Sequence, residues 1–69
     1  MKNLESYLNS FKTSNMSFEA CMRELEFIQS NINTYQVIAT NDKDKKLILK
    51  LFEVRKDLVT KMALIIRAI

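Results

Sequence analysis

The chain of 69 residues contains no glycine, no proline, no tryptophan and no histidine, and it has a single cysteine. Glycine and proline are the residues that tight β-turns, bulges and hairpins usually require. Their absence predicts an all-α fold. Charged residues make up 28% of the chain and aliphatic residues are frequent, a composition typical of folded domains rather than disordered ones.

The same absences narrow the chemistry that the chain can perform. Without histidine, Cys21 has no imidazole to activate it as a nucleophile, and it lies in an apolar pattern where a small core residue is expected. Without glycine there is no phosphate-binding loop, and no histidine or cysteine cluster suggests a metal site. We therefore expect no enzyme activity, no catalytic residue, no cofactor and no metal.

One short segment invites a comparison with calcium-binding loops. In "DKDKKLILKLFE", Asp42, Asp44 and Glu53 stand at the first, third and twelfth positions of such a loop. The fifth position is Lys46, and the sixth, where the sharp turn needs glycine, is Leu47. The pattern is better explained as the capped start of a helix.

A single cysteine cannot form an internal disulfide, which favours a reducing compartment. The N-terminal "MKNLESYLNSF" lacks the continuous apolar segment of a signal peptide. The apolar C-terminal "LVTKMALIIRAI" is too short to span a bilayer and contains Lys61 and Arg67. We expect a cytoplasmic protein with no membrane insertion.

Apolar residues predict three helices in one domain over residues 1–69. A stripe with 3-4 spacing runs from Phe18 to Ala39 and predicts a helix over about 17–39 with Ser17 as N-cap. Asn41 or Asp42 can end that helix and start a second over about 43–68, antiparallel to the first. A shorter helix is expected over about 2–12. The polar "SFKTSNMS" separates it from the next helix, although the spacing also permits one continuous helix.

The last helix should carry two apolar stripes, of which an antiparallel neighbour can cover only one. The first stripe contains Leu47, Leu51, Val54, Leu58, Ile65 and Ile69. Leu51, Leu58 and Ile65 of this stripe should form the hairpin core together with Leu25, Ile28 and Ile32. The second stripe lies about 90° around the helix and contains Ile48, Phe52, Val59 and Ile66, and Met62 lies between the two stripes. The predicted partner-binding site is the second stripe together with Met62.

Three kinds of cover are possible for the second stripe. The N-terminal residues Leu4, Tyr7, Leu8 and Phe11 could fold over it and close a three-helix bundle. Alternatively, a second copy of the chain or a different protein could bind there, since a two-helix core of this size is weak alone and large exposed apolar patches usually mark interfaces. Phe27 is expected to project from the far side of its helix.

Positive charge is concentrated in the second half of the chain. Residues 1–41 contain three bases and four acids, whereas residues 42–69 contain eight bases and four acids. Lys43, Lys46 and Lys50 begin a basic edge, but Glu53 and Asp57 continue it on the same side. Such a broken stripe favours a solvated, ion-paired surface over contact with a nucleic acid.

The chain resembles the small E-type co-chaperones of bacterial type III secretion systems, which hold the needle subunit together with a tetratricopeptide-like chaperone. The resemblance lies in "MKNLESYL", in the helix, short turn and helix of similar total length, and in the apolar close "MALIIRAI". It implies no catalysis and a helical chaperone or secretion subunit as partner. A homodimeric hairpin regulator that binds RNA or DNA is the lower-ranked alternative.

Overall fold

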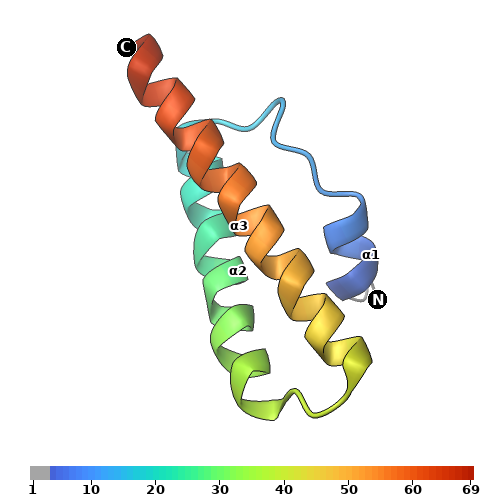
Figure 1. The fold of residues 1–69 in the computed structure, drawn as a ribbon. Coiled ribbons are helices and arrows are strands. Elements are labelled where there is room, and N and C mark those ends of the chain that lie inside the picture. The colour runs from blue at the N-terminus through green and yellow to red at the C-terminus, as the bar shows by residue number, and fades with distance from the viewer. Residues whose placement is uncertain (1–3) are drawn as a thin grey trace.

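The computed structural model describes residues 4–69 and is all-α within that range. The helices are α1 (Leu4–Asn9), α2 (Phe18–Ile38) and α3 (Asp42–Ala68). α2 and α3 form a long antiparallel hairpin, and α1 lies against one side of it (Figure 1). The expected helix over 2–12 is shorter in the structure, and its first residues lie outside the described range. No helix joins Asn9 to Phe18, so the continuous-helix alternative is wrong.

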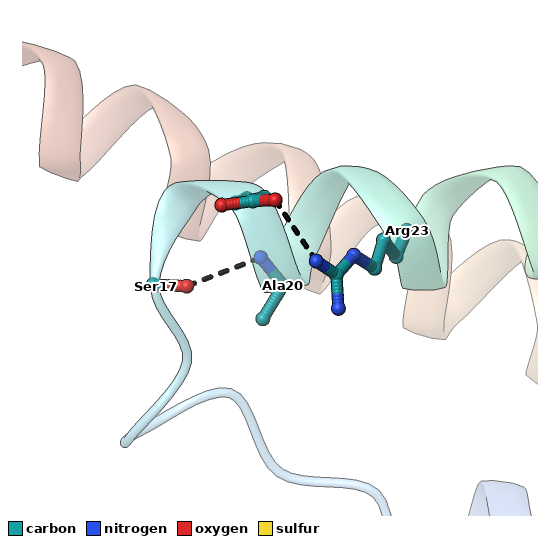
Figure 2. A network of polar contacts seen from close by, with 4 residues as sticks. Ser17, Ala20 and Arg23 are labelled. Carbon is teal, nitrogen blue, oxygen red and sulfur yellow. Dashed lines mark hydrogen bonds and ion pairs between the residues drawn. The ribbon is translucent and has the colours of Figure 1, made fainter.

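Side-chain caps fix the beginnings of both long helices. The Oγ of Ser17 accepts a hydrogen bond of 3.1 Å from the backbone N–H of Ala20, as Figure 2 shows. The Oδ1 of Asn41 accepts one of 2.8 Å from the N–H of Asp44. These bonds satisfy donors that a helix start leaves unpaired. The chain therefore turns between α2 and α3 without glycine, since Ala39 and Asn41 both have ordinary extended backbone angles.

The core lies between α2 and α3 and is purely apolar among the described residues. Its fully buried side chains are Cys21, Ile28, Ile32, Leu51 and Leu58, with Val54 and Leu8 nearly so. Leu25 and Ile65, also predicted for the core, are half-buried. Ile69, the last residue of the first stripe, is 99% exposed. It lies at the end of α3, which projects past the beginning of α2 and has no neighbour there (Figure 1).

Aromatic and polar contacts hold α1 beside the hairpin. The Tyr7 ring meets the Phe27 ring edge-on at 5.4 Å, and its hydroxyl donates a hydrogen bond to the Glu24 carboxylate. Burial, together with that carboxylate, raises the pKa of the Tyr7 hydroxyl above its ordinary value. Phe27 does point away from the hairpin core, but α1 partly covers it. The contact assigns α1 to the side of α2 that carries Glu24 and Phe27.

Candidate partner-binding surface

The second stripe of α3 is not covered by α1. Where α1 meets α3, the two helices border a groove on the other flank of α3, beside its buried Val54. This groove is lined by Leu8, Asn9, Phe11, Lys50, Glu53, Val54 and Asp57. Lys61 donates a hydrogen bond of 3.5 Å to the Ser14 carbonyl, so the connecting segment touches α3 as well. The N-terminal residues therefore fold back onto the hairpin as expected for a bundle, with Leu8 in the core, but they do not cover the second stripe.

α1 lies on the other side of the hairpin because the interaction partners of its side chains are there. Tyr7 meets both an aromatic ring and a carboxylate acceptor on the Glu24 side of α2. The outer border of the second stripe carries the bases Lys45, Lys56 and Arg67, whereas Glu24 lies on the side of α2 that faces α1. A buried hydroxyl needs a hydrogen-bond partner, which favours the side where Glu24 lies.

α2 contributes to the same surface as the second stripe. The Nη1 of Arg55 donates a hydrogen bond of 2.9 Å to the Oε1 of Gln29, and its guanidinium lies 4.7 Å from the centre of the Phe52 ring. Gln29 and Phe52 are therefore on one side of the hairpin. Residues three and four apart share a side of a helix, which places Leu25 and Met22 there too.

We call this surface the open face. It comprises Met22 and Leu25 from α2 with Ile48, Phe52, Val59, Met62 and Ile66 from α3. Within it, Met22 is 48% exposed, Val59 50% and Ile66 57%. Leu25, Ile48, Phe52 and Met62 are half-buried, and all but Ile48 pack against the core. Such a contiguous group of partly exposed apolar side chains is the usual mark of an interface.

The part of the open face on α2 was missed in reading the sequence. Met22 received no role because the apolar pattern of its helix was read as one stripe. A signal was present in the spacing, since Phe18, Met22 and Leu25 follow one another at intervals of four and three residues. The second stripe on α3 is easier to find, because its four members Ile48, Phe52, Val59 and Ile66 are all β-branched or aromatic.

Lys43, Lys46 and Lys50, the basic edge seen in the sequence, lie elsewhere. They border a groove between α1 and the first turns of α3, together with Glu5, Asn9, Asp44 and Leu47. Acids and bases alternate there, so the groove presents no charge of a single sign to a phosphate backbone. Among residues 4–69 there is also no cluster of three or more side chains suited to a metal ion.

Comparison with family models, with curated proteins and with solved structures finds no significant match. None of the helices within residues 4–69 is long and apolar enough to cross a membrane.

Proposed function

We propose that the chain is a non-enzymatic protein-interaction module that holds a helical partner on its open face. The observation that carries the proposal is the exposure of Val59 and Ile66, each at least half accessible and each continuous with the core through Met62. Burial of such aliphatic side chains against a partner favours binding by about 25 cal/mol per Å² of apolar area removed from water. A helical partner fits because the apolar side chains of the open face recur at intervals of three, four or seven residues, the spacing by which helices pack on one another.

The more specific proposal is a co-chaperone role in type III secretion. It rests on the resemblance to the E-type co-chaperones, which bind a tetratricopeptide-like chaperone and keep an aggregation-prone subunit soluble. The hairpin plan and the apolar end of α3 are compatible with that role. In it, the open face would pack on helices of the chaperone, and the protein would act by stabilising its partner rather than by any chemical step.

A co-expression experiment with a tetratricopeptide-like chaperone and a needle subunit tests this role. Ile66 lies on the open face and Leu64 does not, yet both are 57% exposed. We expect Ile66→Asp to prevent co-purification, because a charge there must be desolvated at the interface, while Leu64→Asp preserves it. Both variants should keep the circular dichroism spectrum of the wild type.

Two results would contradict the proposal. Absence of a complex with the wild-type chain would reject the secretion role. Equal loss of the complex in Ile66→Asp and Leu64→Asp would show that the partner surrounds the end of α3 instead of binding the open face.

A further inference from the structure

A row of three bases borders the open face on α3. Lys45, Lys56 and Arg67 follow one another at intervals of eleven residues, which is about three helical turns, so they lie almost in line. All three are exposed. Lys56 comes four residues after Phe52 and three before Val59, which places it directly beside the open face. Of the acids of α3, Glu53 and Asp57 lie toward α1, and Asp42 lies at the start of the helix, three residues before Lys45.

A shorter row of acids borders the open face on α2. Glu19 and Glu26 are seven residues apart, about two turns, and both are exposed. Glu26 lies four residues after Met22 and three before Gln29, so it adjoins the open face. Glu19 forms an exposed ion pair of 2.9 Å with Arg23, whereas no ion pair of Glu26 is found among residues 4–69. The open face thus has one basic border and one acidic border.

The antiparallel register of the hairpin places the charged residues of the two borders at similar positions along the helix axes, which we call their height. The hydrogen bond between the side chains of Gln29 and Arg55 places these residues at similar heights, to about one turn, on antiparallel helices. Glu26 lies three residues before Gln29 on α2, which corresponds to the region of Leu58 on α3. Lys56 is therefore within one helical turn of the height of Glu26, although the two side chains point away from each other across the width of the hairpin.

We propose that a second copy of the chain covers the open face, related to the first by a two-fold axis parallel to the helices. Each α3 then lies over the α2 of the partner subunit, and the four long helices form an antiparallel bundle. A rotation about this axis leaves heights unchanged. Lys56 consequently meets Glu26 of the partner subunit, and the symmetry repeats that pair on the opposite border.

Charge decides between this dimer and the other face-to-face arrangement. A two-fold axis perpendicular to the helices would lay α3 on α3 and bring the two basic rows together. Like charges placed opposite each other across an interface are unfavourable, whereas rows of opposite sign select orientation and partner. Both arrangements cover the apolar side chains of the open face, so the charged borders are what distinguishes them.

This dimer and the proposed function use the same surface, so they exclude each other at any one moment. A heterologous helical partner would have to displace the second copy. The inference rests on the charge rows and the hairpin register, not on the identity of that partner. It can therefore hold even if the secretion role fails.

Charge reversal tests the dimer without disturbing the core, since Lys56 and Glu26 are both exposed. Sedimentation equilibrium should show the wild type as a dimer. Lys56→Glu and Glu26→Lys, each alone, should weaken dimerisation about tenfold, because each places like charges together twice. The chain that carries both changes should regain the wild-type dissociation constant.

Mixing the two single variants gives the sharpest readout. In a mixed dimer, Glu at position 56 of one chain meets Lys at position 26 of the other, and the second border keeps the native pair. We therefore expect an equimolar mixture to dimerise like the wild type, although neither variant does so alone. Circular dichroism of each variant verifies that the helices are intact.

Three outcomes would overturn the inference. The wild type could remain a monomer at all accessible concentrations. Lys56→Glu could dimerise more tightly with the wild type than the wild type does with itself, which would indicate α3 lying on α3. Finally, the wild type could bind a DNA duplex or an RNA hairpin with Lys56→Glu weakening and Glu26→Lys strengthening that binding, which would assign the basic row to a nucleic acid.

Discussion

The two sides of the hairpin differ in a way that the apolar content of α2 and α3 does not explain. On the side of α1, Leu8 and Val54 are 5% and 6% exposed, and Tyr7 is held by Phe27 and Glu24. On the open face, Val59 is 50% exposed although it is a valine on the same helix as Val54. A six-residue helix can cover only one side. The difference shows that α1, held in place by Tyr7, buries one apolar side of the hairpin and leaves the other exposed.

The largest loss of unfolding free energy should come from substitutions in the core between α2 and α3. Leu58→Ala removes a fully buried side chain and is expected to cost about 2–5 kcal/mol of unfolding free energy. Its neighbour Val59 is half exposed, so Val59→Ala should cost less than about 1 kcal/mol in the monomer. Urea unfolding of both variants at low protein concentration measures the contrast. Similar losses for the two would contradict the assignment of Val59 to the surface.

An intermediate loss of unfolding free energy is expected when α1, which covers one side of the hairpin, is removed. Deletion of residues 1–12 removes Leu8 and Tyr7 from the hairpin and exposes Val54, which should lower the unfolding free energy by about 2 kcal/mol. Binding at the open face should remain, because α1 lies on the other side. Urea unfolding and solution mass of the shortened chain measure both quantities. Loss of self-association on deletion would show that α1 contributes to the interface.

The smallest effect concerns the Tyr7 hydroxyl. Tyr7→Phe removes the hydrogen bond to Glu24 and should cost about 1 kcal/mol at neutral pH. Folding raises the pKa of Tyr7, so its contribution is complete below the unfolded-state pKa of about 10 and is lost as the pH rises above that value. The stability difference between the wild type and Tyr7→Phe should therefore shrink in alkaline solution. A difference that stays constant from neutral to strongly alkaline pH would argue against the contact.

Most of the fold was predictable because helix periodicity and capping are local. Ser17 and the Asn41 region mark the helix starts in the sequence, and the structure begins α2 at Phe18 and α3 at Asp42. The position of α1 was not predictable in the same way. It depends on contacts of Tyr7 with residues 17 and 20 positions further along the chain, and no local pattern encodes them.

The candidate surface was predictable only in part for a related reason. The stripe on α3 is visible as a second apolar row on one helix. The contribution of Met22 depends on how α2 is rotated in the hairpin, which the Arg55–Gln29 contact defines. The complementary charge rows lie on two different helices, so they depend on the same register, and no local sequence pattern encodes it.

A matched pair of substitutions on α3 tests the central claim that one side of the hairpin is structural and the other is for binding. Val54→Asp and Val59→Asp make the same chemical change five residues apart, at side chains that are 6% and 50% exposed. Circular dichroism and solution mass should be measured on both. We expect Val54→Asp to lose helix because a carboxylate there must be buried in the apolar core, and Val59→Asp to keep its helix as a monomer that no longer associates. Loss of helix in both variants, or a wild-type assembly of Val59→Asp, would contradict the account.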